Sequence, residues 1–554
     1  MNFKSILLTL AVMCCAPGAM HANFIAATSA NYTSYLGGLV AGDTLSLAPG
    51  NYTSQLNLSN RNGNAGAPIV IMGAGNSTVF LGNACCNTIN ITDCSYLVIR
   101  DLKIDGQNIN YIDGVKAGGG GTHFAHHITL EALTIVNNGG SIVGDNQTVG
   151  ISTKCAAWGW TIRRCTIIAA GTGIYLGNSD STSPFVGGVI ENNLVIDTKG
   201  YNLQIKGQLD NVRDLFPGTA VDGQVTIIRY NVFSKANGST PIGVGDGSRP
   251  CILMDNFPST GNGANDRYEV YGNFFYNNPT EALMQITGNT TAYANVFVNH
   301  VAPAGYGTVV INNHNSFAPR TMNIFHNTVL STSAASGISL SGANTGFQQT
   351  CTANAVFSGG NPITGFTAPN TVDNITGSYA SAASKVNSPS TTLASLDLYP
   401  LASQLQGTLT SNALYLGFSD HDLDFNGDAY DWTYRGAYSG SGTNPGWQLQ
   451  LAIRDPLAPT AVPEHQGMND FLGTVFPDPV NDRFQVILDL EQAITLDLVL
   501  TDLEGRPLQR IWSGIMAPGE NRVGADVNGL SSGFYLLMVH LPDRTLTRKL
   551  LVQH

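Results

Sequence analysis

The sequence predicts an all-β protein: a right-handed parallel β-helix, which is a solenoid of stacked coils, followed by a small antiparallel β-sandwich. Three observations predict this fold. A short motif of an Ile or Val, an Asn and further apolar residues recurs along most of the chain. Gly accounts for 62 of 554 residues and hydrophobic residues for 43%, which suits many short buried strands joined by tight turns. The last eighty residues instead alternate apolar and polar positions in longer segments.

The recurring motif predicts the coils. Its clearest copies are VIENNLVI, IIRYNVFS, EVYGNFFY, AYANVFVN, NIFHNTVL and CTANAVFS, which align Asn193, Asn231, Asn273, Asn295, Asn327 and Asn354 at spacings of 38, 42, 22, 32 and 27 residues. Three upstream segments place Leu102, Leu133 and Cys165 in the same column. Such variable spacing indicates coils of roughly 22 residues, with longer intervals forming loops outside the stack.

The aligned asparagines are expected inside the solenoid. A buried amide is costly unless it is hydrogen-bonded, and stacked amides can donate to one another and to nearby carbonyls. We therefore predict a structural ladder of Asn side chains. Ligand binding by these residues is the alternative interpretation.

Composition and the N-terminus restrict partners and location. The formal net charge of −12 argues against a nucleic-acid partner, which would need clustered Lys and Arg. Lys4, the apolar run 6–13 and the small residues ending at Ala22 predict a signal peptide over residues 1–22. No other segment has the length and apolarity of a membrane span. We expect a secreted monomer.

The remaining chain divides into three segments. Residues 23–447 are assigned to the β-helix, residues 448–470 to a Pro-rich linker and residues 471–554 to the sandwich. Cys85 or Cys86 with Cys94 is the nearest pairing for a disulfide in an oxidising compartment.

The β-helix segment resembles the pectate-lyase-like superfamily. The Asn segments carry this resemblance, together with the opening GDTLSLAPGNYTSQLNL followed by GAPIVIMGAGNSTVFLG, and with DFNGDAYDWTYRGAY at 424–438. The resemblance implies the fold and a polysaccharide as partner. It does not select a reaction, because the scaffold hosts lyases, hydrolases, esterases and adhesins.

The tail resembles the type A C-terminal sorting domain of the type IX secretion system of Bacteroidota. The matching features are Pro477, Pro479, the turn at 502–505, LSSGFY at 530–535, and Arg548 with Lys549. The resemblance implies the type IX secretion machinery as partner. It also implies a location in the medium or on the outer-membrane surface, after processing of the signal peptide and the sorting domain.

Enzymes of this fold work on the outward face of one sheet, so we traced the strands that precede the Asn segments. They are predicted at 149–154, 173–178, 201–208, 242–247, 283–288, 310–315 and 337–342. Side chains alternate across a strand, so a polar row should face outward. The binding residues predicted in or beside this row are Lys154, Gln204, Asp246, Arg249, Gln285 and His314. Solvation of an exposed sheet is the alternative explanation of the row.

β-Elimination of a uronate polymer is the reaction that this row favours. Lys206 is the predicted base, Arg213 or Arg249 would hold the substrate carboxylate, and Tyr175 would donate a proton to the leaving oxygen. Lys154 would lower the pKa of the base. A glycoside hydrolase is less favoured, since it needs two facing carboxylates, for which only Asp246 with Asp255, or Glu281, is available. The alternative function is a non-catalytic glycan-binding or structural surface protein.

A calcium loop is a further hypothesis, although no cofactor is demanded by the sequence. Its oxygen ligands would be Asp422, Asp424, Asn426 and Asp428. Position twelve from the first of these is Thr433, where an EF-hand has a Glu. A structural turn or a modest stabilising Ca²⁺ site is therefore expected.

Two pairs of aromatic side chains are further candidates, and a structural role is favoured for the first pair. His126 and His127 should face opposite sides of a strand and so not serve one site. Trp158 and Trp160 should share a face, where they could stack on a sugar ring or pack a turn.

Overall fold

In the computed structural model the chain forms two compact units, residues 1–456 and 457–554. The described residues are 22–139, 148–237, 249–408, 415, 417–454, 475–476, 480–490, 493–502, 507–531, 533–540 and 545–552. The predicted signal peptide lies outside them, apart from its last residue.

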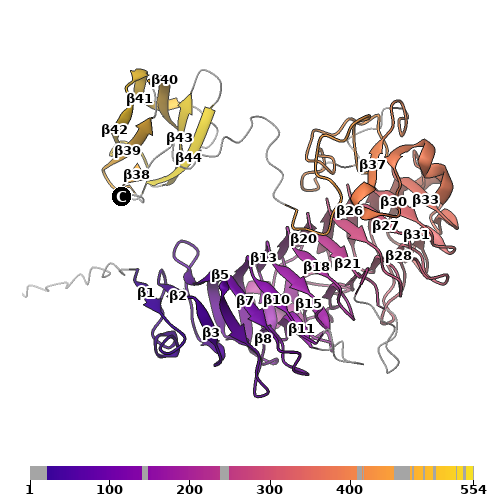
Figure 1. The fold of residues 1–554 in the computed structure, drawn as a ribbon, viewed down its shortest axis with the longest axis horizontal. Coiled ribbons are helices and arrows are strands. Elements are labelled where there is room, and N and C mark those ends of the chain that lie inside the picture. Colours follow the sequence, from indigo (N-terminus) through magenta and orange to yellow (C-terminus); the bar gives the residue numbers. More distant parts are fainter. Residues whose placement is uncertain are drawn as a thin grey trace, which may run out of the picture. The chain divides into compact units, whose positions relative to one another are not determined.

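The first unit is the predicted parallel β-helix (Figure 1). One of its sheets, here called the groove sheet, has eleven described strands, all parallel, in unbroken order along the stack. They are β4 (Leu56–Ser59), β6 (Ile89–Thr92), β8 (Val115–Ala117), β11 (Val149–Thr153), β15 (Thr172–Leu176), β19 (Leu203–Ile205), β22 (Ile252–Met254), β25 (Met284–Ile286), β28 (Val309–Ile311), β31 (Ser336–Leu340) and β34 (Asn361–Thr364).

The rest of the wall is a larger parallel sheet made of two rows of strands. The long strands β5 (Ile69–Leu81) and β7 (Cys94–Asp105) pair in both rows and join them. The first row contains β1 (Phe24–Ala27), β2 (Thr44–Leu47), β9 (Phe124–Glu131), β13 (Thr161–Arg163), β17 (Val189–Glu191), β20 (Val225–Arg229), β23 (Arg267–Tyr271), β26 (Thr290–Tyr293), β29 (Met322–Phe325) and β32 (Gln349–Thr352), with β12 (Ala156–Trp158) and β16 (Phe185–Val186) beside it. The second contains β3 (Gly50–Tyr52), β10 (Thr134–Val136), β14 (Thr166–Ile168), β18 (Leu194–Ile196), β21 (Val232–Ser234), β24 (Phe274–Tyr276), β27 (Val296–Asn299), β30 (Thr328–Ser331), β33 (Ala355–Ser358) and β35 (Ile375–Ser378).

Short elements close the ends and loops of this unit. The helix α1 (Thr33–Leu36) follows β1, and the hairpin β36 (Val386–Ser388) with β37 (Asp397–Pro400) follows the last coil. The 3-10 helices are η1 (Val212–Leu215), η2 (Pro217–Thr219), η3 (Ala368–Asn370), η4 (Tyr379–Ser384) and η5 (Leu393–Ser395).

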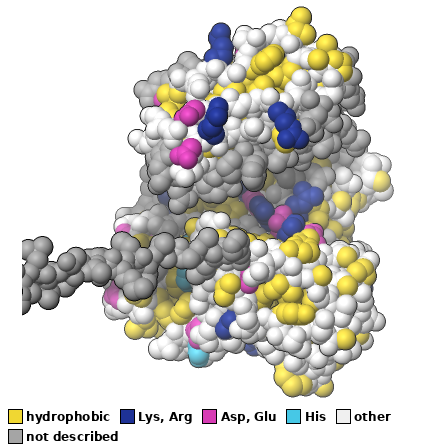
Figure 2. Space-filling view, turned by 90° about the vertical axis from the view of Figure 1, so that its left-hand side faces the viewer, with side chains coloured by type: hydrophobic (Ala, Val, Ile, Leu, Met, Phe, Trp, Pro, Cys, Tyr) yellow, Lys and Arg dark blue, Asp and Glu magenta, His cyan; other side chains and the backbone are white. Residues whose placement is uncertain are grey.

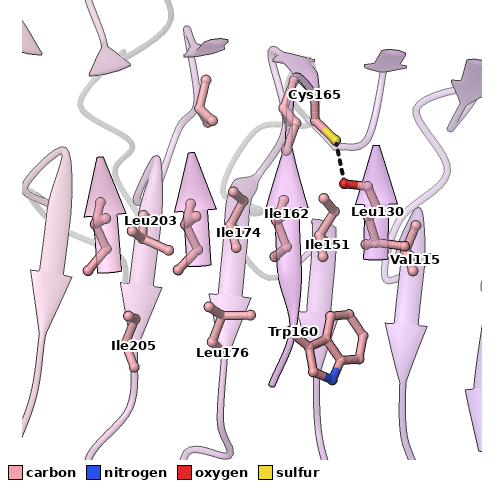
Figure 3. Packing of buried hydrophobic residues seen from close by; sticks show 14 of the residues in the cluster. Val115, Leu130, Ile151, Trp160, Ile162, Cys165, Ile174, Leu176, Leu203 and Ile205 are labelled. Carbon is pink, nitrogen blue, oxygen red and sulfur yellow. Dashed lines mark hydrogen bonds between the residues drawn. The ribbon is translucent and has the colours of Figure 1, made fainter. Parts of the chain in front are cut away.

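Aliphatic side chains fill the interior of the coil in register (Figure 3). Ile151, Ile174 and Leu203 stack on the inner face of the groove sheet, and Leu130 and Ile162 stack opposite them. All five are fully buried. Burial of such a side chain contributes about 1.5–3 kcal/mol, so each coil is stabilised mainly by its neighbours.

The predicted Asn ladder is confirmed. From Asn231 onwards, each ladder Oδ1 accepts both the backbone N–H and the Nδ2–H of the Asn one coil earlier, as Asn231 does from Asn193 at 3.0 and 2.9 Å. The Oδ1 of Asn193 accepts the backbone N–H of Cys165 at 2.9 Å. Each Nδ2 also donates to a backbone carbonyl, for example that of Ile228 from Asn273 at 2.8 Å. The same pattern runs through Asn295, Asn327 and Asn354. It continues to Asn374, which was not among the predicted ladder residues.

A sharp bend precedes every rung of the ladder. The residue before each ladder Asn has a positive φ, between 49° and 64°: Asn192, Tyr230, Gly272, Ala294, His326, Ala353 and Asp373. A side chain other than Gly pays roughly 1–2 kcal/mol for this conformation. The bend turns the chain from the first row into the second, and the hydrogen bonds of the ladder offset its cost.

Two similar bends show that the predicted side-chain directions of the pairs His126–His127 and Trp158–Trp160 are wrong. Because His127 has a φ of 52°, the Nδ1 atoms of His126 and His127 lie 2.8 Å apart on the same side. Gly159, with a φ of 64°, breaks the alternation between Trp158 and Trp160. Trp160 is therefore buried and donates to the Ala125 carbonyl, whereas Trp158 lies partly exposed against His126.

Two further expectations need correction. Cys85 and Cys86 are bonded to each other, while Cys94 is buried and unpaired with its Sγ against the Leu58 carbonyl. Residues 448–454, placed in the linker from the sequence, belong to the first unit. Arg454 is fully buried there and donates to the carbonyls of Gly272 and Phe425.

The second unit is the predicted antiparallel sandwich. It contains β38 (Val475–Phe476), β39 (Arg483–Leu490), β40 (Ile494–Thr501), β41 (Pro507–Met516), β42 (Gly519–Asp526), β43 (Gly533–His540) and β44 (Thr545–Val552). The two sheets, β38-β39-β42 and β41-β40-β43-β44, enclose one apolar core that includes Val486, Leu498 and Leu537.

Replacing a central ladder residue, Asn273→Ala, should lower the free energy of unfolding by about 3 kcal/mol or more. The change removes an amide and leaves the partner groups of Asn231 and Ile228 without their hydrogen bonds. Chemical denaturation of the purified wild type and variant measures this loss in the free energy of unfolding.

The position within the ladder provides the control. Asn374→Ala, at the half-buried end of the ladder, should cost less than Asn273→Ala, and the exposed Asn51→Ala should stay within about 0.5 kcal/mol of wild type. Equal losses at all three positions would show that the ladder contributes nothing specific.

Candidate functional site

The groove sheet presents two columns of outward side chains. Strand register places Lys116, Ser152, Tyr175, Gln204, Leu253, Gln285 and Val310 in a central column. One step past the strand ends, a second column contains Lys154, Gly177, Lys206, Asp255 and Thr287. The backbone N–H groups of all but Gly177 continue the backbone ladder, and that of Gly177 donates to Thr153 Oγ1 at 2.7 Å. Six of the seven predicted strands are confirmed as members of this sheet.

The seventh predicted strand, 242–247, lies outside the described residues. The coil between β19 and β25 is completed by β22, because Leu203 pairs with Ile252 and Ile252 pairs with Met284. The segment ILMD, 252–255, does not alternate apolar and polar residues as an exposed strand would. Its outward residue, Leu253, is apolar because it is covered, with only 1% of its surface exposed. Asp246, predicted on that strand, lies outside the described residues.

Lys154 and Tyr175 form the first part of the cluster. The Nζ atom of Lys154 lies 3.3 Å from the centroid of the Tyr175 ring, an arrangement in which the ring face attracts the cation. Burial lowers the pKa of Lys154 to about 8, and the nearby Lys116 and Lys206 act in the same direction against Asp113. Burial raises the pKa of Tyr175 to about 12, so its hydroxyl keeps its proton at neutral pH.

Gly177 separates the two lysines of the second column. It lies one coil after Lys154 and one coil before Lys206, and a Cβ atom there would lie 3.1 Å from the Lys206 Cβ. A side chain at this position would be crowded by Lys206, so the glycine lets the two lysine-bearing coils stack closely. Burial lowers the pKa of Lys206, Asp255 opposes this shift, and Arg249 reinforces it.

Asp255 and His314 form a carboxylate–imidazole pair next to Lys206. The His314 Nδ1 lies 2.8 Å from Asp255 Oδ2, and Asn315 Nδ2 donates to the same oxygen at 2.9 Å. Asp255 is fully buried, and its pKa is lowered because the hydrogen bond and charge of His314 outweigh desolvation. An ionised carboxylate only accepts hydrogen bonds, so the Nδ1–H of His314 is the donor.

The sequence reading treated Asp255 only as a candidate hydrolase carboxylate. The prediction of a strand at 242–247 hid the register of β22, which puts Asp255 directly after Lys206. The signal that could have revealed it was the spacing: Asp255 follows the inward Met254 as Lys206 follows the inward Ile205.

Three other predicted binding residues are placed around the cluster. Gln204 is 5% exposed and lies between Tyr175 and Leu253. Gln285 donates to Asn312 Oδ1 at 3.0 Å. The guanidinium of Arg249 lies 5.7 Å from the Tyr201 ring, before the start of β22.

The prediction that Arg213 holds the substrate is contradicted by its position. It is fully buried within the loop after β19, is paired with Asp266, and donates from Nε to Gln208 at 2.6 Å and from Nη1 to the Thr219 carbonyl at 3.1 Å. A guanidinium whose nitrogens are all used internally acts as a structural centre for that loop.

The segment predicted as a calcium loop is organised by its own hydrogen bonds. Asp424 Oδ1 accepts from the backbone N–H of Asn426 and Asp428, and its Oδ2 accepts from that of Ser439. Burial raises the pKa of Asp424 to about 6. Among the described residues no three His, Cys, Asp or Glu side chains form a metal-binding group, so Ca²⁺ binding by Asp422 and its neighbours stays a prediction.

The remaining surface offers few charges. Lys, Arg, Asp and Glu side chains are scattered over the face seen in Figure 2, in agreement with a charged fraction of 12%. Lys116, Lys154 and Lys206 lie within the two groove-sheet columns.

Residues 474–553 match the family model of the secretion system C-terminal sorting domain, Por_Secre_tail. The C-terminal unit is a sorting domain. It directs the protein to the type IX secretion route and to a secreted or cell-surface location, which confirms that part of the sequence prediction. In the part of the chain that the structure describes, no helix could cross a membrane.

Solved structures similar to this chain include an alginate lyase from Paenibacillus sp. str. FPU-7, at 18% identity and a TM-score of 0.37, covering 64% of this chain and 98% of that one. Another is the A-module of the mannuronan C-5 epimerase AlgE4 from Azotobacter vinelandii, at 16% identity and a TM-score of 0.38, covering 62% and 92%. No curated protein matches the sequence. Similarity at this level does not choose a reaction.

Asp255→Asn should lower the free energy of unfolding at pH 7 by about 1–3 kcal/mol, because the ionised carboxylate accepts from His314 and Asn315. The pKa of Asp255 is lower in the fold than in the unfolded chain, so the stabilisation is present above about pH 4 and is lost as the pH falls through the folded value. The difference between the two proteins should therefore shrink towards pH 3.

Denaturant unfolding at several pH values measures this difference. Asp101→Asn is the control, since Asp101 is half-buried, has only a surface ion pair with Arg100, and Asn tolerates the positive φ of that position. A gap between wild type and Asp255→Asn that did not change with pH would contradict the charge-based role.

Proposed function

We propose that the protein is a secreted polysaccharide-acting enzyme that cleaves a uronate polymer by β-elimination on the groove sheet. The observation that carries the proposal is the arrangement of two lysines with lowered pKa on either side of a side-chain-free position, beside a tyrosine that keeps its proton. An elimination requires a base and a proton donor close to one another, and these groups lie on neighbouring coils.

The proposed reaction takes place at C4 and C5 of the uronate ring. Neutral Lys206 removes the proton at C5, and the electron pair of that C–H bond forms the C4–C5 double bond. The bond from C4 to the glycosidic oxygen breaks, and this oxygen takes a proton from Tyr175. The products are a shortened chain and a chain with an unsaturated uronate at its end.

The assignment of the base follows from the contacts of the two lysines. The ammonium of Lys154 is already held on the Tyr175 ring, which favours an electrostatic role for it. Lys206 lies between Gly177 and Asp255 in the second column, and no cation–π contact with a described residue holds its ammonium. Its lowered pKa provides more of the neutral form at neutral pH than a free lysine has.

Positive charge near the substrate carboxylate lowers the barrier, since negative charge develops there when C5 loses its proton. Lys154 and Arg249 are the cations placed to supply it; Arg213 is not used. Gln204, Gln285 and His314 extend the polar row along which further sugar units would bind.

A non-catalytic glycan-binding or structural surface protein is the second candidate, and one observation argues against catalysis on the central column. Tyr175, Gln204 and Leu253 are 8%, 5% and 1% exposed, so the central column is well covered. A glycoside hydrolase is disfavoured, because the Asp255 carboxylate already accepts hydrogen bonds from Asn315 and His314. Burial raises the pKa of Glu281 to about 7, and Glu281 interacts electrostatically with Lys235.

The function is tested by incubating the full chain with a panel of uronate polymers and following the ultraviolet absorbance of the unsaturated product. Absorbance should rise with at least one polymer. Binding to a polymer without any rise in absorbance would favour the glycan-binding alternative.

Lys206→Arg should lower kcat by about 10²–10⁴-fold while leaving binding of the same polymer intact, because Arg keeps the charge but stays protonated. Lys103→Arg, on β7 of the other sheet, is the matched control and should be fully active.

The pH profile of wild type tests the same assignment. Activity should rise with pH as Lys206 loses its proton, and the rise should begin below the range of a free lysine because its pKa is lowered. Full activity in Lys206→Arg, or a profile that falls through neutral pH, would remove Lys206 as the base.

A further inference from the structure

A pocket of about 290 Å³ lies on the outer face of the larger sheet, away from the groove sheet. It lies over neighbouring coils, where Arg267, Thr291 and Asn323 point outward from β23, β26 and β29. This volume is at the lower end of the range for ligand pockets, which suits one sugar unit or two.

Two aromatic rings line the pocket. Phe347 is 40% exposed, which is costly for a large apolar side chain that covers nothing. The Arg320 guanidinium lies 5.5 Å from the Phe347 ring, and Arg267 lies 5.8 Å from the Phe418 ring. The cations hold these rings in place on the outside of the coil.

The floor of the pocket carries a chain of polar groups. Thr350 Oγ1 donates to Asn323 Oδ1 at 3.0 Å, and Asn323 Nδ2 donates to Thr291 Oγ1 at 3.3 Å. A threonine hydroxyl that accepts still has a proton to donate, and an amide nitrogen has a second hydrogen. These groups can therefore bind hydroxyls that both donate and accept.

The charge of the pocket is already balanced. Arg267 Nε and Nη2 lie 2.8 and 2.7 Å from Oε1 of Glu269, whose side chain is fully buried. The guanidinium therefore has little free charge for an anion, and the pocket is better suited to hydroxyls than to carboxylates.

We propose that this pocket is a second, non-catalytic binding site for one sugar unit of a polysaccharide. The sugar would place its apolar C–H face against Phe347 or Phe418 and its hydroxyls on Thr291, Asn323 and Arg267. Such a site holds the polymer on a face of the coil where no cleavage is proposed. It does not depend on the reaction at Lys206.

The test measures binding without turnover. Wild type, Phe418→Ala and Phe347→Ala run through native gels containing alginate, polygalacturonate or a neutral β-glucan, and the retardation gives an affinity for each polymer. At least one of the polymers should retard both wild type and the Lys206→Ala variant. Each Phe variant should lose about five- to tenfold in affinity. The loss should persist at high salt, because the contacts are uncharged.

Two further variants keep the test decisive. Thr291→Val preserves the shape of the side chain and should weaken binding without loss of stability. Tyr306→Ala removes an aromatic ring of similar exposure, 39%, outside the pocket and should bind as wild type does. Unchanged affinity in both Phe variants, or no retardation of wild type by any of the polymers, would overturn the proposal. Loss of turnover in Lys206→Ala with retained binding would leave the two sites independent.

Discussion

The hydrogen-bonded column of asparagine side chains is the constraint on which the rest of the β-helix depends. Each amide from Asn193 to Asn354 fixes the next coil at one height and one rotation, since its oxygen accepts two hydrogen bonds and its nitrogen reaches a backbone carbonyl. Because these groups are buried, a coil shifted by one residue would leave several of them unsatisfied. The ladder therefore determines register where apolar packing alone would tolerate slippage.

That register is what brings the candidate catalytic groups together. Lys154, Lys206 and Asp255 are far apart in the sequence, yet each is the first residue after a groove-sheet strand. Stacking in register converts this shared position into a row with neighbours about 4.8 Å apart. Charged groups on adjacent coils then shift one another's pKa without any loop having to be positioned accurately.

Much of this could be read from the sequence, and the failures have physical causes. The Asn motif predicted the ladder and its neighbours, and the alternation of apolar residues placed Tyr175 and Lys206 outward. Alternation failed at β22, where the outward position is occupied by a covered Leu253, and this hid the Asp255–His314 pair. Positive φ values at His127 and Gly159 reversed two predicted faces. The buried ion pair of Arg213 depended on how a long loop folds, which no local pattern reports.

The bend before each rung has a consequence for how such a chain can change its length. Since every coil begins from the same backbone turn and presents the same amide donors and acceptor to the next, an extra coil could be duplicated into the stack without disturbing those on either side. Whole coils are thus interchangeable units of evolution, and loops of different size between Asn193 and Asn354 are compatible with one unbroken column. Diversity in what the outer surfaces bind can accumulate while the interior stays unchanged.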